Sequence, residues 1–167
     1  AYAMDFEHEL DVYFRARCTL ICVVSFEEER IIAGIKSVCE RTKRSLHSWD
    51  HADYLTTLVG EASGISQPKD PISLLESIDK MEGQHVFVLR DFHQCWKGQE
   101  RVIRKLRNLA QRLKYTRKTI VVTSPVSQVP EELRDDMLVM EFPAPDTAQL
   151  GTILAGLEST PGVKVDL

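Results

Sequence analysis

The chain has 167 residues, of which 43% are hydrophobic and 28% charged, and its formal net charge at pH 7 is −4. This is the composition of an ordinary globular protein, so it excludes extensive disorder, and the length fits a single domain over residues 1–167. No apolar stretch reaches the roughly 18 residues that a membrane span needs, and no signal core opens the chain, so we expect a cytoplasmic protein without membrane contact.

The first third of the chain predicts a helix, a strand, a second helix and a short second strand. Apolar residues at helical spacing indicate the first helix, and continuous apolar runs indicate buried strands. The predicted elements are a helix over 4–17, a strand over 18–24, a helix over 27–43 and a strand over 46–49.

The junction after the first strand has the position of a nucleotide-binding loop without its chemistry. A phosphate loop reads G-x-x-x-x-G-K-[ST], because backbone N–H groups and a lysine must hold the phosphates. Here the chain reads Ser25-Phe-Glu-Glu-Glu-Arg30, and none of its eight glycines precedes a lysine. Ser25 and Glu28 match the S-x-x-E capping box, so we expect the helix to cap itself where a phosphate would bind.

The rest of the chain continues the alternation of helices and strands. Asp70-Pro71 is a typical helix start, and Gly83 is expected to end that helix. Further predictions are a loop over 60–69, a strand over 86–89, a loop over 92–98, a helix to about Tyr115, a strand over 119–124, a helical turn at Pro130, a strand over 137–142 and a last helix from Asp146 to about Leu157. About five nearly apolar strands alternating with helices predict a three-layer α/β fold with a parallel sheet.

Two buried strands end in residues suited to a nucleotide site. Asp91 follows one strand, where nucleotide hydrolases hold Mg²⁺, and Ser124 ends another. Both can equally be turn or cap residues of a purely structural kind. We therefore regard Asp91 and Ser124 as candidate remnants of a nucleotide site.

A metal centre is a weaker hypothesis. Asp91, His93 and Cys95 alternate along one segment, and His47 and His51 could join them. Their spacing lacks the close pairs typical of zinc sites, so we expect no metal. The four cysteines form no C-x-x-C pair and are expected to be reduced core residues, and no motif indicates a catalytic nucleophile.

A basic segment covers residues 101–118, which hold eight lysines and arginines and no acid. Its candidate interaction residues are Arg104, Lys105, Arg107 and Lys114. A solvated helix face is the plain interpretation, and an acidic protein surface is the favoured specific partner. Nucleic-acid binding is not favoured, because the chain as a whole is acidic and no aromatic stacking pattern accompanies the helix.

Five segments carry a resemblance to a known family: Phe14-Arg-Ala-Arg17, Ser25-Phe-Glu-Glu-Glu-Arg30, Val86-Phe-Val-Leu-Arg-Asp-Phe-His93, Ile103-Arg-Lys-Leu-Arg-Asn-Leu-Ala110 and Glu141-Phe-Pro-Ala-Pro-Asp146. Taken together, they resemble the N-terminal region of a plastid and cyanobacterial family of AAA ATPases with bacterial relatives. The resemblance implies a nucleoside-triphosphatase-like fold with strand order 5-1-4-3-2 that has lost its phosphate loop. It also implies a following AAA module, which would bind ATP and Mg²⁺.

The sequence thus favours a non-catalytic accessory or assembly domain of an AAA ATPase, without a cofactor of its own. Its expected partners are the C-terminal AAA module and neighbouring subunits of the same protein. Two alternatives stay open: a nucleotide-binding ATPase or sensor that uses Asp91 and Ser124, and a nucleic-acid adaptor that uses a basic helix over 101–118.

Overall fold

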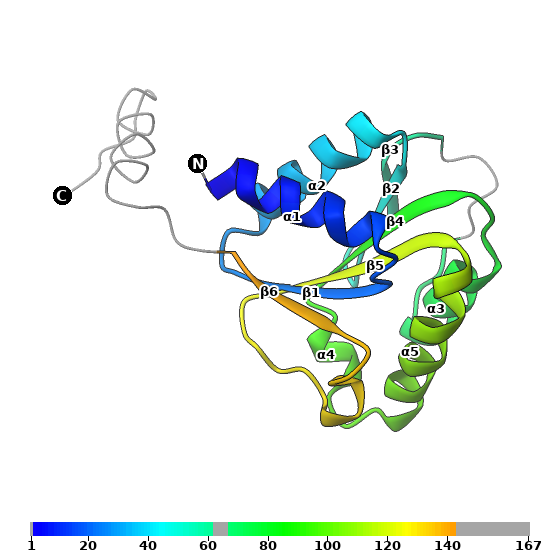
Figure 1. Ribbon diagram of the computed structural model, residues 1–167. Helices are drawn as coiled ribbons and strands as arrows, with labels where there is room; N and C mark the ends of the chain where they lie inside the picture. Colours follow the sequence, from blue (N-terminus) through cyan, green and yellow to red (C-terminus); the bar gives the residue numbers. More distant parts are fainter. Residues whose placement is uncertain (1, 62–66, 143–167) are drawn as a thin grey trace, which may run out of the picture.

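The computed structural model describes residues 2–61 and 67–142, which build a six-stranded sheet between two layers of helices (Figure 1). The sheet order is β3-β2-β4-β5-β1-β6, and every neighbouring pair is parallel except β2 and β3. The strands are β1 (Leu20–Val24), β2 (Ser45–Asp50), β3 (Tyr54–Val59), β4 (Gln84–Arg90), β5 (Arg117–Ser124) and β6 (Leu138–Glu141). The predicted three-layer α/β fold is confirmed, and without β3 the order is the one that the resemblance implies.

Each face of the sheet carries its own hydrophobic core. Helices α1 (Tyr2–Arg15) and α2 (Glu28–Thr42) cover one face, and α3 (Pro71–Lys80) and α5 (Glu100–Arg112) cover the other (Figure 1). Successive side chains of a strand point to opposite faces, so Ile21 and Val23 enter the first core while Leu20 and Cys22 enter the second. Burial on both faces explains why the strands are apolar throughout.

The start of α3 forms as the sequence predicts. The Asp70 carboxylate accepts hydrogen bonds from the Ser73 N–H at 3.0 Å and the Ser73 hydroxyl at 2.7 Å, and Pro71 occupies the first helical position. The helix ends at Lys80, before Gly83, whose φ of +106° belongs to the turn into β4.

Three predictions about elements were wrong. Strand β3 was missed, because the tight turn that joins it to β2 contains no glycine. The Asp50 carboxylate stabilises this turn by accepting hydrogen bonds from the N–H groups of Ala52 and Asp53. The predicted loop 92–98 contains a helical turn, α4 (His93–Trp96). The basic segment is not one helix, since α5 and the 3₁₀ turn η1 (Leu113–Tyr115) are followed by β5, which contains Arg117 and Lys118.

The turn predicted at Pro130 is the 3₁₀ helix η2 (Glu131–Leu133), and the helix predicted over 146–157 lies outside the described residues. In the part of the chain that the structure describes, none of the helices combines the length and apolarity needed to cross a membrane.

Candidate functional site

The carboxyl ends of β1, β4 and β5 meet at one edge of the sheet, where open parallel sheets bind their ligands. The Ser25 N–H donates to the Ser124 carbonyl at 2.9 Å, and the Asp91 N–H donates to the Thr123 carbonyl at 2.9 Å. The structure therefore brings the sequence-predicted residues Ser25, Asp91 and Ser124 to the same edge.

Only Ser25, Phe26 and Glu27 connect β1 to α2. The Ser25 hydroxyl oxygen accepts the N–H of Glu27 at 3.0 Å and closes a tight turn. A loop of the G-x-x-x-x-G-K-[ST] type is longer, because it has to pass around a phosphate. The three-residue connection in this chain is too short to form such a loop around a phosphate.

The predicted capping box of Ser25 and Glu28 is not formed. The residue before the helix is Glu27, whose side chain makes no capping hydrogen bond and instead contacts the Arg30 guanidinium at 2.9 Å. The prediction was wrong for two reasons. The Ser25 hydroxyl accepts the N–H of Glu27, which is only two residues along the chain, and the Glu28 carboxylate points toward the sheet.

Glu28 meets the end of β4. The Thr123 hydroxyl donates to one Glu28 carboxylate oxygen at 3.3 Å, and the Arg90 Nε lies 3.8 Å from the other. Burial is the main cause that raises the pKa of Glu28, with nearby Asp91 adding to it and the Arg90 charge opposing it. A nucleotide phosphate would meet carboxylates here, and the lysine and glycine N–H groups of a nucleotide-binding loop are absent from this junction.

Asp91 and Ser124 have different environments. Asp91 has a φ of +53° and lines a hollow of about 280 Å³ together with Glu28, Asp50 and Arg90. Ser124 is only 2% exposed, and its hydroxyl donates to the Val126 carbonyl at 2.6 Å while accepting the Val126 N–H at 3.1 Å. Asp91 is thus accessible at this edge, whereas the Ser124 hydroxyl already forms hydrogen bonds to the backbone of its own turn.

The same hollow contains a thiol and an imidazole. The Cys95 sulfur lies 3.2 Å from the His51 Nε2, and burial raises the pKa of Cys95 to about 11. The thiol is therefore protonated near neutral pH and is a poor nucleophile. Burial has the same effect on Cys22.

The five candidate metal ligands do not form one site. Asp91, His51 and Cys95 line the same hollow, but the turn α4 replaces the extended alternation and buries His93. His47 lies within β2, against Thr57 and His85. Within residues 2–61 and 67–142, no three His, Cys, Asp or Glu side chains are arranged to hold a metal ion.

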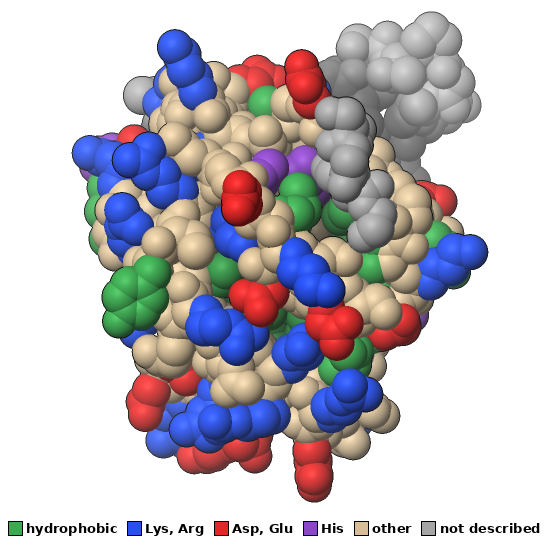
Figure 2. Space-filling view, turned by 90° about the vertical axis from the view of Figure 1, so that its right-hand side faces the viewer, with side chains coloured by type: hydrophobic (Ala, Val, Ile, Leu, Met, Phe, Trp, Pro, Cys, Tyr) green, Lys and Arg blue, Asp and Glu red, His purple; other side chains and the backbone are tan. Residues whose placement is uncertain are grey.

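The predicted basic face is divided by internal ion pairs. The Lys105 ammonium lies 3.7 Å from Glu76, the Arg107 guanidinium lies 3.8 Å from Asp136, and Lys118 is buried. Arg104 and Lys114 are exposed and form no ion pair with any described residue. Figure 2 accordingly shows Lys and Arg interspersed with Asp and Glu over the side of the molecule that carries α3 and α5.

Arg90 was not singled out by the sequence analysis, although it neutralises the acidic turn after β1. An arginine at the end of a buried strand was the available signal, but only the sheet order places it opposite Glu28 and Glu29.

Residues 6–142 match the family model described as the SpoVK-like AAA ATPase, N-terminal domain. An uncharacterised AAA domain-containing protein, ycf46, of Guillardia theta is 31% identical over 163 residues, which cover 95% of this chain and 31% of that protein. The protein of the same name from Trieres chinensis is 30% identical over 166 residues, covering 98% of this chain and 33% of that protein. The chain spans about a third of the length of these relatives.

Proposed function

Because the chain belongs to the family of SpoVK-like AAA ATPase N-terminal domains, we propose that it is a non-catalytic accessory and assembly domain of an AAA ATPase. It acts through protein contacts, and its partners are a C-terminal AAA module and neighbouring subunits of the same protein. ATP and Mg²⁺ bind to that module and not to this domain. The four thiols are free, which supports the cytoplasmic setting that the sequence predicts.

The observation that carries this proposal is the closed connection between β1 and α2. A hydrolase of this fold binds phosphate through a long glycine-rich loop and a lysine at this position. Three residues replace that loop, and the Glu28 carboxylate and the Arg90 guanidinium pair with each other beside it. The sheet geometry of a hydrolase is kept while its phosphate contacts are absent, which supports a scaffold role.

Exposed aromatic side chains support contact with other proteins. Phe26 is 87% exposed at the carboxyl edge, and Tyr115 is 90% exposed at the end of η1, next to Lys114. Aromatic side chains are enriched at protein interfaces, because they bury a large area at a small entropic cost. We define the α5 face as Arg104, Lys114 and Tyr115, and propose that it docks on an acidic protein surface.

A calorimetric titration of the chain with ATP and Mg²⁺ tests the absence of nucleotide binding. We expect no saturable heat, because carboxylates occupy the phosphate position. Micromolar binding that is lost in Asp91→Asn and retained in Asp135→Asn, an exposed control, would replace this proposal with the nucleotide-sensor alternative. Binding that both variants retain would also contradict it and would place the nucleotide elsewhere.

A further inference from the structure

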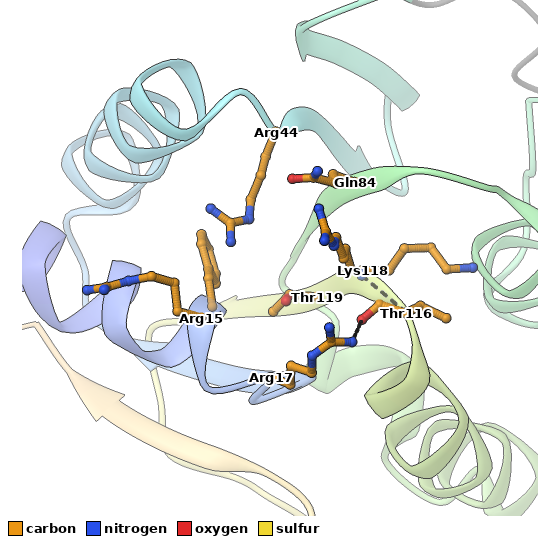
Figure 3. Close-up of a pocket in the computed structure, with 9 residues that line it drawn as sticks. Arg15, Arg17, Arg44, Gln84, Thr116, Lys118 and Thr119 are labelled. Carbon is orange, nitrogen blue, oxygen red and sulfur yellow. Dashed lines mark hydrogen bonds between the residues drawn. The ribbon is translucent and has the colours of Figure 1, made fainter.

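A second hollow lies at the opposite edge of the sheet, where β4 and β5 begin. It has a volume of about 190 Å³, and residues from the end of α1, the approach to β2 and the starts of β4 and β5 line it (Figure 3). The polar side chains that matter here are Arg17, Arg44, Gln84, Thr116, Arg117 and Thr119. No aspartate or glutamate is among the lining residues.

Three arginines of this hollow have no carboxylate partner. Among the described residues, no ion pair involves Arg17, Arg44 or Arg117, and the same holds for Arg101 and Arg104 on α5. The arginines that do have a carboxylate within 4.0 Å are Arg15, Arg30, Arg41, Arg90, Arg107, Arg112 and Arg134. Three of the five described arginines without a carboxylate partner therefore lie in this hollow, in a chain whose net charge is negative.

Two of these guanidinium groups are held in position by the fold. The Arg17 Nη1 donates to the Thr116 carbonyl at 3.0 Å, and the Arg44 guanidinium lies 5.4 Å from the centre of the Phe14 ring. Figure 3 shows Arg44 extending from the start of β2 into the space above Thr119. Positioned donors lose less entropy when they bind an anion than freely moving ones do.

Two neighbouring cations do not contribute their charge. Arg15 extends away from the hollow (Figure 3) and pairs with Asp11 at 3.5 Å. The Lys118 ammonium is directed into the protein, where it donates to the Ile78 carbonyl at 2.6 Å and the Asp79 carbonyl at 3.0 Å. The charge of the hollow thus comes from Arg17, Arg44 and Arg117.

We propose that this hollow is a binding site for a single phosphate group, either free phosphate or the phosphate of a small phosphorylated molecule. A phosphate group carries a charge of about −1.5 to −2 at pH 7 and matches two or three guanidinium groups better than a carboxylate does. The hollow is smaller than the roughly 300 to 1,000 Å³ of sites that enclose a whole drug-sized ligand, so it suits a phosphate group and not an enclosed nucleotide. This proposal does not depend on the accessory-domain function.

Amide chemical shifts recorded during a titration with inorganic phosphate at constant ionic strength test the site. We expect saturable shifts centred on Arg17, Gln84 and Thr119, and none during a matched chloride titration. Arg44→Gln and Arg117→Gln should each weaken phosphate binding about tenfold, and the double variant should abolish it. Arg101→Gln removes an unpaired arginine from α5 and should leave the affinity unchanged.

Thermal unfolding of each variant shows whether it folds, so a loss of binding in a folded variant is informative.

Titration with a sugar phosphate separates the two sources of the phosphate group. Tighter binding than inorganic phosphate at the same residues indicates a phosphorylated molecule, and equal binding indicates free phosphate. Shifts that do not saturate, or that Arg101→Gln reduces as much as Arg44→Gln, would overturn the proposal. Binding of a DNA or RNA oligonucleotide far tighter than phosphate, lost in Arg44→Gln, would replace it with a nucleic-acid site.

Discussion

His47 is fully buried, and both of its ring nitrogens form hydrogen bonds. Nδ1 lies 2.9 Å from the Thr57 hydroxyl, Nε2 lies 3.0 Å from Nδ1 of His85, and Nε2 of His85 lies 2.7 Å from the Glu82 carbonyl. Since a carbonyl can only accept, His85 carries its proton on Nε2, and neutral His85 must then accept at Nδ1. His47 therefore donates through Nε2 and accepts the Thr57 hydroxyl proton at Nδ1.

This chain of hydrogen bonds predicts a loss of stability in acid. Burial, and secondarily His85, lower the pKa of His47 from 6.5 to about 4. Between these pH values the unfolded chain binds a proton that the folded chain does not, so the free energy of unfolding falls as the pH drops from about 6.5 to about 4. Urea unfolding at several pH values should show a loss of at most about 3 kcal/mol from this group.

The variant His47→Gln separates the contribution of His47 to the pH dependence of stability from the contributions of other titrating groups. It should be less stable than the wild type at pH 7.5, and the difference should narrow toward pH 4. His8→Gln, at an exposed position on α1, is the control and should follow the wild type. A difference that stays constant with pH would contradict the assignment to His47.

Asp70 and Ser25 offer a matched test of helix starts. The Asp70 carboxylate caps α3 through the Ser73 N–H, whereas the Ser25 hydroxyl lies outside α2 and holds only the turn before it. Asp70→Ala should lower the free energy of unfolding by about 1 kcal/mol, and Ser25→Ala by less than half of that. Urea unfolding at pH 7 measures both, and equal losses would show that Ser25 acts as a cap after all.

At the scale of elements, α5 serves two functions in the proposal. Its buried residues Val102, Leu106 and Leu109 fix it against the sheet. Its exposed Arg104 forms the α5 face together with Lys114 and Tyr115 of the following turn η1. Of the four basic residues predicted as an interaction face, Lys105 and Arg107 already pair with carboxylates inside the domain. An incoming acidic partner would have to compete for them, so the proposed docking depends mainly on Arg104 and Lys114.

Charge reversal of the α5 face predicts a loss of assembly without a loss of folding. Arg104→Glu combined with Lys114→Glu should weaken docking onto the AAA module about tenfold or more, because two attractive contacts become repulsive. Sedimentation of the longer protein that carries this domain measures the assembly. Lys36→Glu with Lys97→Glu makes the same charge change at other exposed positions and should have little effect. Unchanged assembly in the α5 variant would leave this face as solvated surface.

At the scale of the whole molecule, the two edges of the sheet have opposite charge. A parallel sheet brings the ends of its strands to one edge and their starts to the other. Glu28, Asp50 and Asp91 lie at the carboxyl edge, and Arg17, Arg44 and Arg117 lie at the amino edge. Phosphate ligands of open α/β sheets bind at the carboxyl edge, whereas the phosphate site that we propose lies at the amino edge.

Much of this architecture could be predicted from the sequence, because burial on both faces makes a parallel strand apolar throughout. β1, β4 and β5 can be recognised for that reason. The helix start at Asp70-Pro71 can be recognised because a capping side chain bonds to an N–H group only a few residues along the chain. β3 was missed because its half-exposed, threonine-rich pattern and its turn without glycine carry a weak local signal.

The sequence by itself determined the layered fold, the absence of a phosphate loop and the acidic turn that stands in its place, since these depend on residue type and on neighbours along the chain. Tertiary structure decided which charges meet. Glu28 and Arg90 are far apart in sequence, as are Arg17, Arg44 and Arg117, and only the sheet order brings each set together. Electrostatic interactions depend on distance in space and on burial, which a linear pattern does not specify.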